Sequence, residues 1–251
     1  MKIVVCIKHV PDTETKIVIV DDGKSINSNG VKYILNPYDE YAVEEALQIK
    51  EANEESEVVA ISVGDDSTQS SIRSALAMGV DRGTLLKTGN FALVDPFSVA
   101  KILAEEIKLE SPDIILTGKM SIDAYGSQVP GLIAELLELP VVNLARDIVL
   151  SEGKATVKRD IEGGSETLIT TLPAVISAEK GLNNPRYPAL KGIMQAKKKP
   201  LEIKEINLDE TDVEIIELTY PKQKPAGRIV GNSADAAVEL VKLLRQEAKV
   251  I

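Results

Sequence analysis

Short apolar runs alternate with amphipathic helical patterns through the first 145 residues, and this alternation constrains the fold more than any other feature. The first run, Ile3–Ile7, is apolar throughout and rich in β-branched residues, which is typical of a strand buried on both faces. Similar runs follow at 57–64, 82–87 and 112–118, each separated from the one before by a helical pattern. This order predicts an α/β fold, a doubly wound parallel sheet with right-handed crossovers.

The helical patterns carry their own boundary signals. Asp95–Pro96 places a proline in the first turn of one helix, and Gly79 follows the last apolar residues of another. A strongly apolar helix is expected over 129–137. These signals support separate helices between the strands.

The pattern changes after residue 145, where three short β-rich runs lie close together. They occupy 148–150, 155–159 and 166–170, and glycine-containing segments connect them, which is typical of antiparallel hairpins. A further apolar run, Pro173–Ser177, predicts one more buried strand. We therefore expect an antiparallel β extension over 145–177.

The last part of the chain divides into a stiff loop, a short helix and an arm. Two prolines stiffen the loop over 183–188, and an apolar helix is expected over 190–196. Residues 201–232 show no strong period and are expected to form an extended arm. The arm leads to an amphipathic helix over 234–248, which we expect to pack on another chain or, alternatively, back on its own domain.

Charge and aromatic content exclude several classes of protein. Lys and Arg total 29 against 39 Asp and Glu, so the net charge is −10, whereas nucleic-acid binders normally carry a basic surface. Aromatic residues make up only 3%, so stacking platforms for bases or a flavin ring are scarce. The apolar run at the N-terminus is too short for a signal peptide or a membrane span, so we expect a cytoplasmic protein without membrane insertion.

The chain has one cysteine, Cys6, and one histidine, His9. A single cysteine excludes an internal disulfide, a Cys-ligated zinc site and an iron–sulfur cluster held by this chain alone. A catalytic triad would have to use His9, and no G-x-S-x-G segment is present. We interpret Cys6 as a core residue rather than a reactive thiol. The chain is therefore expected to work through a cofactor or a partner.

In an open α/β sheet, ligands bind at the carboxyl ends of the strands, near the point where the strand order reverses. Four segments meet that description, at Cys6–His9, Asn36–Asp39, Val63–Asp65 and Gly118–Pro130. The last combines neutral hydroxyl and amide donors with the start of a helix, whose free backbone N–H groups suit a phosphate. Neither a G-x-G-x-x-G fingerprint nor a P-loop is present. The alternative is an ordinary crossover loop in which Asp123 caps the helix.

Lys197–Lys199 places three consecutive positive charges at the end of the short helix. Such a run is usually a solvated helix end that the helix dipole favours. The alternative is an electrostatic landing site for an acidic partner.

Four stretches are more specific than any single loop. Val157–Leu168 reads VKRDIEGGSETL and continues to Ser177, and Asn184–Lys199 reads NPRYPALKGIMQAKKK. Asn36–Asp39 (NPYD) and Ala75–Gly83 (ALAMGVDRG) add supporting matches. Together these stretches resemble the β-subunit family of electron transfer flavoprotein, and the resemblance spans nearly the whole chain.

The resemblance implies a Rossmann-like domain of the adenine nucleotide alpha hydrolase-like type over 1–182, which binds AMP as a structural ligand. It also implies a heterodimer, in which an α subunit holds the redox-active FAD and this chain, itself no enzyme, helps to enclose the FAD. The arm and helix over 201–251 would then pack on the α subunit. Carried over by position, the AMP contacts are Cys6, Asn36, Pro37, Tyr38, Asp39, Val63, Lys119, Met120, Ser121, Ile122, Asp123, Ala124, Tyr125, Gly126, Ser127, Gln128, Val129 and Pro130.

The resemblance further implies a partner-recognition segment over 183–200 that docks acyl-CoA or related dehydrogenases. Electrons from these enzymes of fatty-acid β-oxidation would pass through the flavin to an electron transfer flavoprotein–quinone oxidoreductase. A protruding apolar side chain on a proline-stiffened loop, here Leu190, loses little entropy on docking. The residues expected to dock are Pro185, Arg186, Tyr187, Leu190, Ile193 and Met194.

Two other functions are compatible with parts of the sequence. One is an electron-bifurcating relative, which would bind a second FAD in place of AMP and oxidise NADH. The stretch Val10–Thr13 (VPDT) is common in that kind of protein. The other is a universal-stress-like nucleotide-binding protein or an adenylate-processing enzyme. It would need a glycine-rich phosphate loop or a pyrophosphatase motif, and neither is found.

Overall fold

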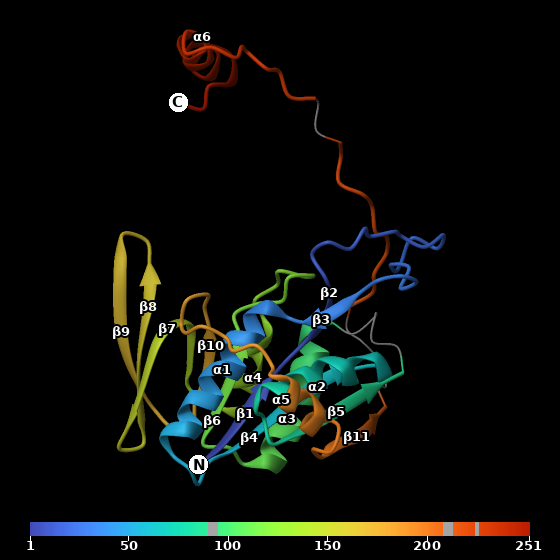
Figure 1. Ribbon diagram of the computed structural model, residues 1–251, viewed down its shortest axis with the longest axis vertical. Helices are drawn as coiled ribbons and strands as arrows, with labels where there is room; N and C mark the ends of the chain where they lie inside the picture. Colours follow the sequence, from blue (N-terminus) through green and yellow to red (C-terminus); the bar gives the residue numbers. More distant parts are fainter. Residues whose placement is uncertain (90–94, 208–212, 224–225) are drawn as a thin grey trace. The chain divides into compact units, whose positions relative to one another are not determined.

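The computed structural model describes residues 1–89, 95–207, 213–223 and 226–251 (Figure 1). The chain divides into two compact units, Met1–Glu217 and Leu218–Ile251. The first unit contains a large sheet with helices on both faces, and the second contains the C-terminal helix. The domain boundaries expected after residues 182 and 200 fall inside the first unit and stay predictions.

Among the described residues, nine strands form one sheet, in the order β11-β5-β4-β1-β6-β10-β7-β8-β9. Neighbouring strands are parallel from β11 to β7 and antiparallel from β7 to β9. β1 lies inside the sheet, with β4 and β5 on one side and β6 on the other, so the strand order reverses at β1 as in a doubly wound fold. The predicted fold class is confirmed. The strands are β1 (Lys2–Cys6), β4 (Glu57–Gly64), β5 (Arg82–Thr88), β6 (Ile114–Gly118), β7 (Val141–Ser151), β8 (Lys154–Ile161), β9 (Gly164–Thr171), β10 (Val175–Ala178) and β11 (Leu201–Ile206).

Two apolar clusters lie on opposite faces of the sheet. Along β1, Ile3 and Val5 belong to the cluster that includes residues of α1 and α2, whereas Val4 and Cys6 belong to the cluster with α3 and α4. This alternation follows from the period of two in a strand. Side chains buried on both faces explain why the parallel strands read as continuous apolar runs. The helices are α1 (Pro37–Ala52), α2 (Gln69–Met78), α3 (Pro96–Glu110), α4 (Val129–Leu137) and α5 (Leu190–Ala196).

The helix ends follow the local signals of the sequence. Pro37 occupies the first turn of α1, where its missing N–H costs nothing. The Asp95 carboxylate accepts hydrogen bonds from the backbone nitrogens of Phe97 (2.8 Å) and Ser98 (3.1 Å) and so caps α3. Gly79 follows the last residue of α2, and its φ of 146° is accessible to glycine but strained for other residues.

β7 is longer than the sequence pattern indicated. Residues 148–150 were expected as a short separate run, but they belong to a strand of 11 residues that begins at Val141. Its first part pairs in parallel with β10, and its second part pairs antiparallel with β8. Figure 1 shows β8 and β9 extending from this edge of the sheet. The strand therefore carries the chain directly from the parallel sheet into the β extension.

Two features of the first unit differ from the expectation. β2 (His9–Pro11) and β3 (Tyr33–Leu35) form a short antiparallel pair, which the sequence did not indicate because each strand has only three residues. Residues 201–206 were expected to belong to an extended arm, but they form β11, the outer strand beside β5. The expectation was wrong there because an outer strand buries few side chains, and in β11 Leu201 and Ile206 are the residues that pack against the two core clusters.

The second unit contains α6 (Ala236–Leu243), which continues as a π-type turn over Leu244–Ala248. This agrees with the helix expected over 234–248. No residue of α6 is buried, and the Val238 side chain is 77% exposed. Within its own unit the apolar stripe of this helix therefore has no cover. No described helix of the protein is both long and apolar enough to cross a membrane.

Candidate functional site

The carboxyl ends of four parallel strands meet at one edge of the sheet, which we call the carboxyl edge. Cys6 at the end of β1 pairs in register with Ile61 of β4 and with Thr117 of β6. Gly118 at the end of β6 pairs with Ala178 of β10. The segments that follow these strands are therefore brought together where a doubly wound sheet binds its ligands.

Asp39, in the first turn of α1, joins three of these segments. Its buried carboxylate accepts hydrogen bonds from the backbone nitrogen of Lys8 (2.7 Å), the amide of Asn36 (2.9 Å) and the backbone nitrogen of Gly118 (3.2 Å). Burial raises the pKa of the Asp39 carboxyl to about 7, although its hydrogen bonds favour the ionised form. Asp39 thus fixes the start of α1 against the ends of β1 and β6.

Gly118 makes this close approach possible. A Cβ atom at this position would lie 2.2 Å from Oδ1 of Asp39 and 2.7 Å from the carbonyl carbon of Tyr38. No ordinary side chain fits there without moving the start of α1. The glycine at the end of β6 is therefore required by packing rather than by a turn.

Asn36 holds the loop that follows β6. Its side-chain amide donates to the backbone oxygen of Met120 (2.9 Å), and its side-chain oxygen accepts from the backbone nitrogen of Ile122 (3.1 Å). Asn36 is 1% exposed, so these bonds replace water that the amide has lost. The first half of the loop is fixed to the start of α1 in this way.

Lys8 binds the same loop from the other side. Its Nζ lies 2.8 Å from a carboxylate oxygen of Asp123 and 3.3 Å from the hydroxyl of Ser121. Burial raises the pKa of Asp123, but the attraction of Lys8 and the hydrogen bonds from Lys8 and Ser121 together outweigh it, so the net shift is downward. Asp123 does not cap α4, because the N-cap position is Gln128, which makes no side-chain cap hydrogen bond. The alternative reading of Asp123 as a helix cap is therefore wrong.

Lys119 is held by two groups at the edge of the loop. Its Nζ lies 2.7 Å from a carboxylate oxygen of Glu179, which follows β10, and 4.8 Å from the centre of the Tyr38 ring. A cation over a tyrosine face is an attractive contact. Lys119 therefore connects β6, β10 and the start of α1.

The tip of the loop, from Ala124 to Gln128, is exposed. Tyr125 and Ser127 both have φ near 52°, so the backbone bends sharply before α4 begins. The first N–H groups of a helix have no partner inside the helix, so Val129 and Gly131 present donors at this end. Pro130 has no N–H and presents none. This end of α4 has the donor set that an anion requires.

The buried hydroxyl of Thr117 lies one residue before the end of β6, and its oxygen has no hydrogen-bond partner among the described residues. Thr117 is two residues after Ile115 in β6, so its side chain lies on the same face of the strand. That face packs against α3 and α4. Thr84 and Thr88 in β5 have similar buried hydroxyls, but that of Thr117 lies at the carboxyl edge, where a polar ligand would satisfy it.

Comparison with known proteins decides the family. The electron transfer flavoprotein domain matches residues 24–209. The "Electron transfer flavoprotein subunit beta" of Syntrophomonas wolfei is 43% identical over 251 residues, covering 100% of this chain and 98% of that protein. The protein of the same name from Bacillus subtilis is 42% identical over 260 residues and 100% of both chains. The one from Homo sapiens is 37% identical over 98% of each. The chain belongs to the electron transfer flavoprotein β-subunit family.

The site residues expected from the family resemblance fall into two groups. Asn36, Tyr38, Asp39 and the loop from Lys119 to Asp123 lie together at the carboxyl edge. Cys6 and Val63 lie beneath this edge and are buried in the cluster with α3 and α4. Burial, with a smaller contribution from Asp39, raises the pKa of the Cys6 thiol to about 12. Cys6 is therefore a protonated core residue, as the sequence indicated.

Lys8 and Gly118 fall within two of the four segments expected at this edge but were not named as ligand contacts, and Glu179 lay outside all four. Lys8 and Gly118 stand beside the ends of β1 and β6, so their position was a usable signal. Glu179 follows β10 and gave no signal, because its partner Lys119 is 60 residues away in the sequence.

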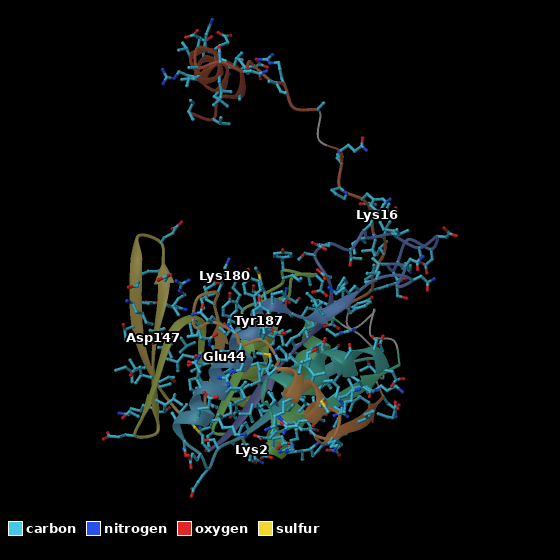
Figure 2. All side chains as sticks on the ribbon, in the orientation of Figure 1. Lys2, Lys16, Glu44, Asp147, Lys180 and Tyr187 are labelled. Carbon is cyan, nitrogen blue, oxygen red and sulfur yellow. The ribbon has the colours of Figure 1, made fainter. Side chains whose placement is uncertain are left out.

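The expected docking segment lies on the face covered by α1 and α2. The Arg186 guanidinium binds the carboxylates of Glu44 and Glu51 in α1, with Nη2 to Glu44 Oε1 at 2.9 Å. Figure 2 shows Glu44 and Tyr187 in the same part of the molecule. The side chain of Tyr187 is 96% exposed, and that of Leu190 is 83% exposed. The segment is thus fixed to α1 through Arg186, while Tyr187 and Leu190 project into solvent.

Lys199 is neither a solvated helix end nor a landing site for a partner, the two interpretations of the Lys197–Lys199 run. Its Nζ donates to the backbone oxygens of Leu76 (3.0 Å) and Val80 (2.6 Å), at the end of α2. Burial lowers the pKa of Lys199. Arg73 also donates to the backbone oxygen of Ala196 (2.6 Å). Lys199 is therefore a structural link between α2 and the end of α5, and only the two lysines before it are exposed.

Proposed function

We propose that this chain is the β subunit of a heterodimeric electron transfer flavoprotein, in which it binds AMP and helps to enclose the FAD held by an α subunit. The proposal rests on family membership and on the hydrogen-bonded loop from Lys119 to Asp123, which leads into the exposed start of α4. The chain acts as an electron-carrier subunit and not as an enzyme.

The arrangement of donors supports AMP at the carboxyl edge. The N–H groups of Val129 and Gly131 suit the phosphate, and the free hydroxyl of Thr117 supplies a polar contact beneath the loop. Lys8 and Lys119 are already paired with carboxylates, so they set the shape of the loop and keep the local charge balanced. Such a site suits a ligand that stiffens the protein rather than one that reacts.

The exposed apolar face of α6 supports binding of an α subunit, because a helix with an uncovered apolar stripe gains stability when another surface buries it. FAD supplies the redox chemistry in this assembly. The chain itself contributes binding and orientation, and the paired, buried side chains of the carboxyl edge keep that part of the protein rigid.

The exposed side chains of Tyr187, Leu190 and Met194 support docking of a dehydrogenase. Leu190 and Met194 are one helical turn apart in α5, so they project from the same side. Acyl-CoA or related dehydrogenases would donate electrons here, and a quinone oxidoreductase would accept them. Exposed apolar anchors on a fixed base are typical of binding hot spots.

The ligand content of the purified complex tests this function. The chain is co-expressed with an α subunit of the same family, the complex is denatured, and released FAD and AMP are quantified. One FAD and one AMP per heterodimer is the expected result. Two FAD without AMP would instead identify an electron-bifurcating protein, and a complex without flavin would contradict both functions.

A further inference from the structure

A second concave region is lined by residues on either side of the Asn36–Asp39 segment, among them Leu35 and Glu40. It has a volume of about 440 Å³ and lies between β3, α1, α2 and the segment from Pro185 to Pro188. Ligand pockets have volumes of roughly 300 to 1,000 Å³, so this cleft is large enough for a bound group. None of the residues expected to bind AMP lines it.

Three tyrosines and one carboxylate define the chemistry of the cleft. Tyr33, Tyr41 and Tyr187 line it together with Glu40 from the first turn of α1. Across the described parts of the chain, no hydrogen bond or ion pair engages the Glu40 carboxylate. Burial raises the pKa of Glu40, which reflects a carboxylate that has lost water without gaining a cation.

The other charged residue of the lining is already neutralised. Arg186 binds Glu44 and Glu51, so it adds no free positive charge to the cleft. The remaining lining residues are serines and apolar or tyrosine side chains. The cleft therefore has an unpaired negative charge among aromatic rings, and this combination favours a cation such as an ammonium or guanidinium group.

The position of the cleft indicates where the cation comes from. The segment from Pro185 to Pro188 forms one wall and leads directly into α5, which carries the exposed Leu190 and Met194. A partner that covers Leu190 would also reach the cleft. The net charge of −10 favours a partner with basic groups on its contact surface.

We propose that a lysine or arginine side chain of the dehydrogenase that docks on Leu190 enters this cleft and pairs with Glu40. This inference rests on the docking role proposed above. The apolar anchor supplies affinity, and the pair at Glu40 sets the orientation of the partner and adds an electrostatic attraction that depends on salt.

The test uses the intact heterodimer and a purified acyl-CoA dehydrogenase. Glu40→Gln keeps the size of the side chain and removes its charge, and Glu105→Gln removes an equal charge from the exposed side of α3 as a matched control. We expect Glu40→Gln to raise the apparent KM for the heterodimer about tenfold at low salt, with kcat unchanged. The dependence of KM on NaCl should also become weaker, while Glu105→Gln behaves as the parent.

Leu190→Ala separates the two proposals. If Leu190→Ala raises KM and Glu40→Gln does not, the cleft is not a docking site, whereas the docking role of α5 stands. If Leu190→Ala has no effect on KM, the docking role itself fails. A third outcome is that spermidine binds the parent heterodimer but not the Glu40→Gln variant, while KM is the same for both. That result would assign the cleft to a small cation and overturn the inference. Loss of α subunit from the Glu40→Gln complex would overturn it too.

Discussion

The carboxylate of Asp39 lies 3.2 Å from the backbone nitrogen of Gly118, a residue 79 positions away in the sequence. The same carboxylate accepts a hydrogen bond from the backbone of Lys8. The start of α1 is thereby fixed between the ends of the two strands where the strand order reverses.

Substitution of Gly118 should disturb the edge directly. Gly118→Ala would place a Cβ atom 2.2 Å from Asp39 Oδ1, so α1 or β6 must move. Overpacking of this kind costs about 1–3 kcal/mol, and the free energy of unfolding measured in urea should fall by that amount. AMP content should fall as well. Gly164→Ala is the control, because nothing lies within 4 Å of its Cβ position, and equal stabilities of the two variants would contradict the prediction.

The pH dependence of stability should report the burial of Asp39. Its pKa is about 7 in the folded chain against a usual value of 3.8. Between these values the folded chain keeps a proton that the unfolded chain has released. The contribution of Asp39 to the free energy of unfolding is therefore complete below about pH 4 and is lost as the pH rises through about 7.

Asp39→Asn serves as a reference for this measurement, because asparagine does not titrate. Urea unfolding of both proteins from pH 4 to pH 8 should show the parent losing stability relative to the variant as the pH rises. Other carboxylates, such as Asp123, titrate in both proteins and cancel from the difference. A difference that stays constant or increases over this range would show that the Asp39 pKa is not raised.

The pair between Lys8 and Asp123 should matter for ligand retention more than for stability. Asp123→Asn removes the ion pair at 2.8 Å and frees the middle of the loop that leads to α4. The pair is partly exposed, so we expect a loss of at most about 1 kcal/mol in the free energy of unfolding. AMP retained after dialysis should decrease clearly. Asp66→Asn, which breaks the exposed pair with Lys87, should leave AMP retention unchanged.

The bidentate contacts of Arg186 should determine the rigidity of the docking segment. Arg186→Lys keeps the charge but cannot bind Glu44 and Glu51 together through a planar fork. We expect faster limited proteolysis between residues 183 and 190 and slower electron acceptance from a dehydrogenase, with flavin content unchanged. Arg159→Lys, in the β extension, is a control, because Arg159 pairs with one carboxylate, that of Glu166, far from the docking segment in sequence. Cleavage at the parental rate would show that the segment does not depend on Arg186.

The local pattern of the sequence predicted the framework of the protein. The strand at 57–64 and the helices at 129–137 and 190–196 were located to the residue, because the hydrophobic pattern of each is contained within one short segment. The four segments at the carboxyl edge were also predictable, since parallel strands bring their ends together. Cys6 was predictable as a core residue for the same reason.

The tertiary structure decided which residues of these segments meet. Asp123 binds Lys8 instead of capping α4, Lys199 binds the end of α2 instead of facing solvent, and residues 201–206 join the sheet beside β5. The partners of Asp123 and Lys199 are 115 and 123 residues away. Sequence patterns record the period of one element and its ends, whereas a hydrogen-bond partner at such separation is set by how the elements pack.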